Sequence, residues 1–165
     1  MSREVDRIAD QMRRAWSGDA WLGTSLAELL ADVAAEEAHA KPIAGAHSIW
    51  ELVNHIAVWE DAARRRVEGN PARIEISSDE DWPPVGDTSE AAWNAARAHL
   101  ALTQDALLRA IAGMSDARLD EIVGAGHDQT LYVLLHGVVQ HDTYHGGQIS
   151  LLKRALRPRP GGGAK

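Results

Sequence analysis

The sequence predicts an all-α protein, a four-helix bundle built around one core. Apolar residues recur at spacings of three and four in four long segments, which is the period of an amphipathic helix. Strand-like alternation is nearly absent, and 165 residues suit a single hydrophobic core. Four amphipathic helices bury their apolar faces by packing against one another, so a bundle follows.

Two helices are expected before the first break in the pattern. The first runs over about residues 2–16, where apolar side chains recur on one face. A short helix over about residues 25–31 follows. Pro42 and Gly45 then interrupt the helical pattern.

The second long helix is expected to begin after Ser48. Ser48 and Glu51 have the spacing of a capping box, in which each side chain bonds the backbone N–H of the other residue. Apolar residues continue at helical spacing up to the Gly-Asn-Pro sequence at 69–71, which ends the helix.

Residues 70–87 form the longest irregular stretch of the sequence. The run DEDWPPVGDTSE is acidic and contains two prolines, which argues against a helix, and Ile74 and Ile76 suggest a brief extended piece. A loop of this length in a compact domain usually carries a function or moves.

Two further helices complete the predicted bundle. The third long helix begins near Thr88 or Ser89 and ends at Gly113. The fourth begins near Thr130 and runs to about Leu156, where a proline follows closely.

We expect one bundle domain over residues 1–157. A disordered tail is expected over residues 158–165, where proline and glycine dominate. The charged N-terminal sequence lacks the apolar stretch of a signal peptide, so a cytoplasmic location is the default expectation.

Composition limits the functions open to the chain. The formal net charge is −7, from 17 Lys and Arg against 24 Asp and Glu, which argues against general nucleic-acid binding. The sequence has no cysteine, so a metal would be held by nitrogen and oxygen ligands. No segment has the apolar length to span a bilayer, so no membrane partner is expected.

The strongest chemical signal is the sequence HDTYH within the fourth long helix. His141 and His145 are four residues apart, so a helix places them on one face, one turn apart. They interrupt an apolar stripe between Val138 and Leu152, so they point into the bundle. A buried imidazole needs partners for its ring nitrogens, and one metal ion would supply a partner to both residues. A hydrogen-bonded core histidine is the competing interpretation.

A third ligand should come from a facing helix, as in other bundle metal sites. His55 is the best candidate, because it lies beside the apolar stripe of Leu52 and Ile56 in the second long helix. Three protein ligands would leave a coordination position open, which is typical of catalytic zinc sites. The other histidines have no partner at ligand spacing on an inner face and are weaker candidates: His39, His47, His99, His127 and His136.

Five more residues are candidates for roles around the metal. Glu51 and Asp142 are candidate general bases, although Glu51 also fits the helix cap. Asp142 stands where an HExxH metalloprotease has Glu, so that arrangement is excluded. Trp59, Tyr144 and Gln148 are candidates for a pocket wall or for packing residues.

Two segments resemble the DinB-like (damage-inducible, YfiT-like) superfamily of bacterial metalloproteins. They are GAHSIWELVNHIAVWEDAARRRVEGN and TLYVLLHGVVQHDTYHGGQISLLKRAL, the second of which contains HxxYHxGQI. The resemblance extends over nearly the whole chain, including the DWPPV loop. It implies a four-helix bundle with a long crossover connection, usually a homodimer. It also implies a nickel or zinc ion held by His55, His141 and His145. Leu22 departs from the resemblance, because related proteins often have a histidine there.

Proteins similar in these segments include transferases that use low-molecular-weight thiols such as bacillithiol or mycothiol. The leading hypothesis is therefore a metal-dependent enzyme of the S-transferase type, which takes its thiol from a small molecule. A metal-dependent hydrolase is one alternative, and a non-enzymatic, stress-related metal-binding protein is the other. The expected partner is a small-molecule substrate or thiol.

Overall fold

The regular structure of the chain is entirely helical, and the predicted all-α class is confirmed. The computed structural model describes residues 3–70, 73–124, 126 and 128–157, and it contains no strand within them. Its helices are α1 (Glu4–Ser17), α2 (Leu26–Leu30), α3 (Ala35–His39), α4 (Ile49–Val67), α5 (Glu90–Ala112), the 3₁₀-helix η1 (Asp116–Asp120) and α6 (Leu131–Leu156).

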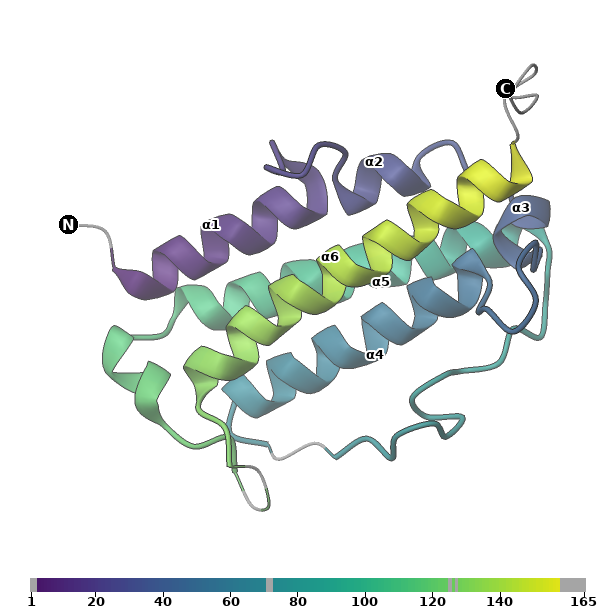
Figure 1. The fold of residues 1–165 in the computed structure, drawn as a ribbon. Coiled ribbons are helices and arrows are strands. Elements are labelled where there is room, and N and C mark those ends of the chain that lie inside the picture. Colours follow the sequence, from purple (N-terminus) through teal and green to yellow (C-terminus); the bar gives the residue numbers. More distant parts are fainter. Residues whose placement is uncertain (1–2, 71–72, 125, 127, 158–165) are drawn as a thin grey trace.

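The four long helices α1, α4, α5 and α6 lie side by side and form the body of the molecule (Figure 1). Helices α4 and α5 run in the same direction, so the chain between them returns along the length of the bundle (Figure 1). The described parts of this crossover loop are residues 68–70 and 73–89, and the longer part passes beside α4 (Figure 1). The short α2 packs against α1 and α6, and α3 packs against α4 and α5.

Capping residues set the starts of α4, α5 and α6, near the positions that the sequence predicts. Ser48 Oγ accepts a hydrogen bond from Glu51 N at 3.2 Å, and the Glu51 carboxylate accepts one from Ser48 N at 2.7 Å, which completes the capping box. Ser89 caps α5 and Thr130 caps α6 through their side-chain oxygens.

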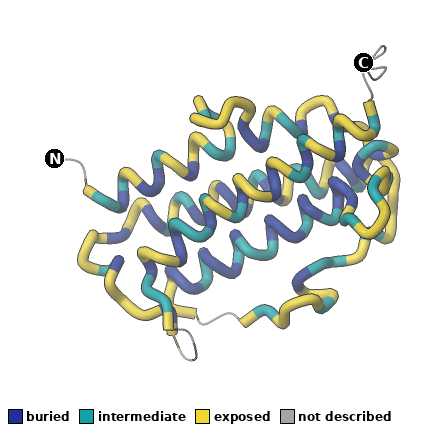
Figure 2. Tube along the Cα trace, viewed as in Figure 1, coloured by how far each residue is buried: buried dark blue, intermediate teal, exposed yellow. Residues whose placement is uncertain are grey.

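The hydrophobic core is divided into two clusters along the bundle. One cluster contains Met12 and Leu107, and the other contains Trp93 and Ile149. Figure 2 shows that the buried residues follow the inner faces of the long helices.

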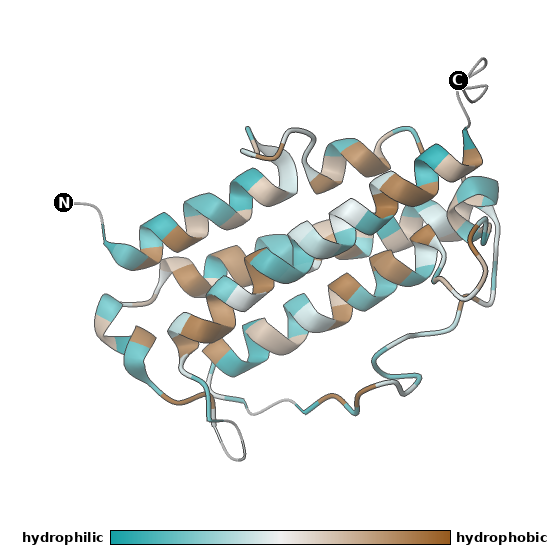
Figure 3. Ribbon diagram, viewed as in Figure 1, coloured by the Kyte–Doolittle hydropathy of each residue, from teal (hydrophilic) through white to brown (hydrophobic). Residues whose placement is uncertain are grey.

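A layer of buried polar side chains separates the two clusters. On each helix concerned, these residues fall between the members of one cluster and those of the other. They are Glu60 of α4, Thr103 and Gln104 of α5, and Asp142 of α6. Figure 3 shows the corresponding hydrophilic stretch in the middle of α6, between apolar turns.

Helix α3 was not predicted, because its sequence AEEAH has no apolar periodicity. Its first turn is stabilised by a distant residue instead. The Glu90 carboxylate at the start of α5 accepts a hydrogen bond from Ala35 N at 2.7 Å, while Ala35 and Ala38 are buried.

The extended piece expected at Ile74 and Ile76 is wrong. Neither residue belongs to a strand, and the Ile76 side chain is exposed, since no neighbouring strand is available to pair with it. The disordered tail expected over 158–165 lies outside the described residues. In the part of the chain that is described, no helix is both long and apolar enough to cross a membrane.

Candidate metal centre

Three histidines from two helices meet beside the polar layer of the bundle. His55 comes from α4, and His141 and His145 come from successive turns of α6. His55 and His145 are buried, whereas His141 is partly exposed. The predicted facing of α4 and α6 therefore brings together all three residues chosen from the sequence.

The three side chains converge through the same ring atom. His141 Nε2 lies 3.0 Å from His55 Nε2 and 3.1 Å from His145 Nε2. The three ligand atoms all lie within 4.8 Å of one another, so a single metal ion could be held between them.

Hydrogen bonds at the opposite ring nitrogens fix the tautomers. His55 Nδ1 donates to the Asp81 backbone carbonyl at 2.8 Å, and His145 Nδ1 donates to Gln148 Oε1 at 2.7 Å. The Nε2 atoms of both rings therefore carry lone pairs, and both point at His141 Nε2. One hydrogen on His141 can satisfy only one of them, whereas a cation at the centre satisfies all three.

The local electrostatics keep these rings in the form that binds metal. Burial lowers the pKa of His55, and burial together with the neighbouring His141 lowers the pKa of His145 to about 4. Neutral imidazoles are ligands for zinc and nickel, so this donor set fits the ion that the resemblance implies.

Neither of the two carboxylates chosen as candidate bases lines the cavity that adjoins His141. Glu51 is occupied by the helix cap and by a salt bridge to Lys41. Asp142 is buried, and neither of its carboxylate oxygens has a hydrogen-bond partner among the described residues. Its Oδ1 lies 3.8 Å from His141 Nδ1, and burial raises its pKa. A cation bound at His141 would offset part of the cost of burying this carboxylate.

The crossover loop supplies a residue that the sequence analysis missed. Asp81 is buried and its carboxylate accepts hydrogen bonds from Trp59 Nε1 at 2.8 Å and Ser77 N at 2.9 Å. Ser77 has a φ of 64°, in the left-handed region that side chains rarely adopt. These bonds hold the Asp81 carbonyl against His55. The acidic run at 79–81 was the available signal, but it does not distinguish Asp81 from its exposed neighbours.

Trp82, the next residue of the loop, covers the His55 ring. The two rings are stacked with centroids 3.8 Å apart, and His47 stacks on the other face of Trp82 at 3.5 Å. His47 is therefore part of the support of the site rather than a freely solvated loop residue.

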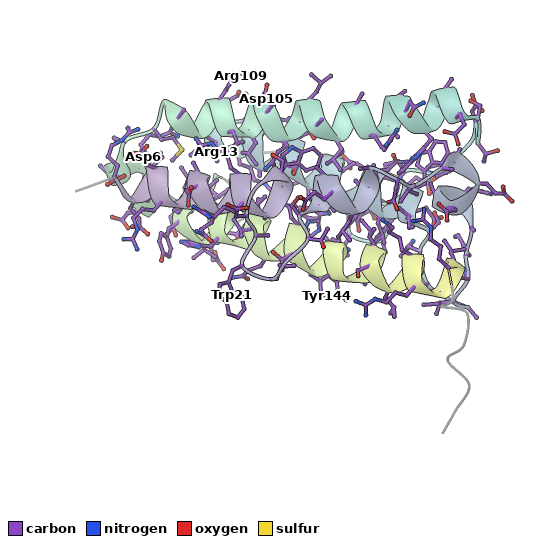
Figure 4. All side chains as sticks on the ribbon, turned by 90° about the horizontal axis from the view of Figure 1, so that it is seen from above. Asp6, Arg13, Trp21, Asp105, Arg109 and Tyr144 are labelled. Carbon is purple, nitrogen blue, oxygen red and sulfur yellow. The ribbon has the colours of Figure 1, made fainter. Side chains whose placement is uncertain are left out.

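A cavity of about 560 Å³ opens beside His141, between α4 and α6. Trp59 forms part of its wall, as predicted for a pocket residue. Gln148 instead orients His145. Tyr144 is exposed and contacts the His145 ring with its edge, and Figure 4 shows it on the same outer side of the molecule as Trp21.

His39, His99 and His136 do not join the three converging histidines. His39 and His99 are exposed. His136 lines the cavity beside His141, and its Nε2 is buried without a hydrogen-bond partner among the described residues. His127 lies outside the described residues.

Comparisons with known proteins support the fold and the family. The structure is similar to a crystal structure described as a conserved protein from Enterococcus faecalis, with a TM-score of 0.71 and 15% sequence identity. The similarity covers 96% of this chain and 100% of the other. No functionally curated protein matches the sequence. The family model of the DinB superfamily matches residues 20–149, and the chain therefore belongs to the DinB superfamily.

Proposed function

We propose that the chain is a metal-dependent enzyme that transfers a low-molecular-weight thiol to a small electrophile. Nickel or zinc is the proposed ion, bound by His55, His141 and His145. The observation that carries the proposal is the convergence of three imidazole nitrogens, two with fixed lone pairs, beside a cavity of ligand size that His141 lines.

The chain's own residues prepare this site. Asp81 and Gln148 hold two of the rings in position, and Trp82 shields His55 from water. A divalent ion held here would lower the pKa of a thiol bound beside it, so that a thiolate forms at neutral pH. Trp59 offers an apolar surface on which the electrophile can lie next to His141.

The thiol has to come from a small molecule, because the sequence contains no cysteine. In the proposed reaction the thiolate sulfur forms a bond to an electrophilic carbon and the leaving group departs with the bonding electron pair. The thiol proton passes to solvent. The proposed partners are therefore small molecules, and the cytoplasmic location stays a prediction.

Metal analysis tests the binding site. Wild-type protein purified without chelators should contain about one zinc or nickel ion per chain, and His141→Ala should contain almost none. His99→Ala is the matched control, since His99 is exposed on α5 and should leave the metal content unchanged. Metal-free wild-type protein under these conditions would remove the proposal.

Thiol transfer is tested separately with monochlorobimane, whose chloride is displaced as the carbon–sulfur bond forms. The metal-loaded protein should accelerate its conjugation to bacillithiol, mycothiol, glutathione or coenzyme A. Conjugation should fall to the uncatalysed rate after His141→Ala. No acceleration with any of these thiols would leave a metal-binding protein without the proposed activity.

Hydrolysis is a second candidate, and Glu60 is the observation that favours it. Glu60 is the carboxyl side chain that lines the same cavity as His141. Burial, and then the neighbouring Asp142, raises its pKa, and a carboxylate of raised pKa is a more effective proton acceptor. Turnover of p-nitrophenyl acetate that disappears in Glu60→Gln would support hydrolysis over thiol transfer.

A further inference from the structure

Three aromatic rings form a parallel stack beside the three converging histidines. The Trp82 ring lies between the rings of His47 and His55, with its centroid 3.5 Å from the first and 3.8 Å from the second. The ring planes deviate from parallel by only 4° and 5°. The Trp82 ring also stands at 84° to the His145 ring, with centroids 6.2 Å apart. One loop residue therefore lies against both buried histidines of the site.

The two histidines of the stack belong to the start of α4, whereas Trp82 belongs to the crossover loop. His47 directly precedes Ser48, the N-cap residue, so the capping box holds its backbone in place. His55 lies about two turns into the same helix. The side chains of His47 and His55 therefore form a slot on α4 that holds the indole ring of Trp82.

The stack restrains His55 in a way that its hydrogen bond does not. The bond from His55 Nδ1 to the Asp81 carbonyl fixes one edge of the imidazole. The ring could still swing about that edge, and Nε2 would then leave the point where the three histidines converge. Contact with the flat face of Trp82 blocks this swing. A ligand ring that is already held in place loses less conformational freedom when a metal binds.

Trp82 belongs to a loop, so contacts with the bundle decide where its ring lies. Within the loop, its backbone N–H donates to the Ser78 carbonyl at 2.9 Å, and Ser77 has a φ of 64°. A residue other than glycine keeps such a backbone only where the surrounding contacts maintain it. The slot supplies contacts of this kind, because His47 covers the face of the indole that His55 leaves free.

We propose that this slot couples the crossover loop to metal binding, with His47 as its positioning residue. A metal held by His55 fixes one wall of the slot, so Trp82 is held more firmly against α4. His47 forms the other wall, so it raises the metal affinity from outside the ligand set. Coupling is reciprocal, so the docked loop tightens metal binding by the factor by which the metal tightens loop docking. This inference rests on the metal site of the proposed function and not on thiol transfer.

Zinc affinity tests the role of the His47 ring, measured by competition with a chromogenic chelator on the full-length chain. The His47 side chain is 45% exposed, so its replacement leaves the core intact. His47→Ala and His47→Leu should each weaken zinc binding by about fivefold, which is within the range of a stacked aromatic pair. His47→Phe restores a flat ring and should bind zinc as wild type does.

Two results would overturn the role of the stack. One is wild-type affinity in His47→Ala. The other is an affinity of His47→Phe as low as that of His47→Ala, because the imidazole would then act through its nitrogens or its charge and not as a flat ring. His39→Ala is the matched control, since it removes an exposed histidine of α3 and should leave the affinity unchanged.

The absorption bands of bound cobalt(II) give a readout that a merely structural role would not change. These bands depend on how the ligands are arranged around the ion. They should shift in His47→Ala and return to the wild-type positions in His47→Phe. Identical bands in wild type and His47→Ala would contradict the positioning of His55 through Trp82.

Hydrogen–deuterium exchange tests the reciprocal effect on the loop. Zinc should slow exchange at the backbone amides of Ser77 and Trp82, both of which are hydrogen-bonded within the loop. The slowing should be smaller in His47→Ala and unchanged in His39→Ala. Equal exchange rates with and without zinc in the wild-type loop would overturn the coupling.

The outcomes separate this inference from the proposed function. A wild-type chain that takes up no zinc overturns both. A chain that binds zinc with no dependence on the His47 ring overturns the inference alone. A chain that shows the coupling but transfers no thiol keeps the inference and loses the proposed reaction.

Discussion

Glu60 and Asp142 are buried carboxyl groups in the polar layer between the two apolar clusters. Burial raises the pKa of both groups. The neighbouring Asp142 raises the pKa of Glu60 further, whereas His141 opposes the shift at Asp142. Buried groups of this kind reduce stability unless a ligand or a metal uses them. Both groups lie next to the histidines or the cavity, which is where a functional site would explain a loss of stability.

The raised pKa of Glu60 should make the stability of the fold depend on pH. A carboxyl group whose folded pKa exceeds its unfolded pKa stabilises the fold below the unfolded pKa, and this contribution is lost as pH rises through the folded pKa. Glu60→Gln stays neutral. Its free energy of unfolding relative to wild type should therefore increase between pH 5 and pH 9 by more than about 1 kcal/mol.

Urea unfolding in the presence of chelator measures this difference at pH 5, 7 and 9. Glu36→Gln, which changes an exposed carboxylate on α3, should show no such trend. A difference between Glu60→Gln and wild type that does not change with pH would show that the Glu60 carboxyl ionises normally.

The crossover loop and α4 together support the three converging histidines. Asp81 bonds Trp59 and orients His55, and Trp82 stacks on the same histidine. The hydrogen-bond partner of His55 Nδ1 therefore comes from the crossover loop and not from another helix of the bundle.

Asp81→Ala removes the carboxylate that fastens the loop to Trp59 and Ser77. Because partners of ligating histidines commonly contribute tenfold to hundredfold in affinity, zinc binding should weaken by about that factor. Competition with a chromogenic chelator measures the zinc affinity. Asp79→Ala, in an exposed part of the same loop, is the control, and equal affinities for the two variants would contradict the support role.

Helix caps and the histidine pair could be predicted from the sequence because their determinants are local. Ser48 and Glu51 are three residues apart, and His141 and His145 are four apart, so helix geometry alone relates them. Asp81 reaches His55 across 26 positions of the chain, and helix α3 depends on Glu90, 55 positions away from Ala35. No periodic pattern encodes such contacts, which arise only when the crossover loop and α5 have packed.

The division of the core could not be predicted either. The apolar stripes of α4 and α5 appear nearly continuous in the sequence, because one polar residue in a stripe resembles an ordinary exception, and in α6 the two histidines are the visible interruption. Only the packing shows that Glu60, Thr103 and Asp142 fall at the same level and form a layer.

For the whole molecule, the outer face of α6 predicts self-association. Tyr144 and Leu151 lie two turns apart on this helix and are exposed by 65% and 56%. Large apolar side chains in such an arrangement commonly mark interfaces between copies, and a two-fold dimer is the commonest closed assembly. The homodimer expected from the family resemblance therefore stays a prediction.

Light scattering after size-exclusion chromatography should give twice the chain mass of 17.9 kDa. Leu151→Glu should shift the protein to the monomer mass. Leu102→Glu introduces the same charge at an exposed leucine of α5 and should leave the dimer intact. A monomer mass for wild type at all concentrations would rule out the dimer.

The parallel course of α4 and α5 has a consequence for how this protein can be altered. Helix α4 has 19 residues and is about 28 Å long, so any chain joining its end to the start of α5 must travel past the histidines. The bundle stores most of the buried apolar contacts, whereas the loop carries Asp81 and Trp82. Grafting a different loop between the same two helices would thus change the residues that support the three histidines, while the helical bundle stays the same.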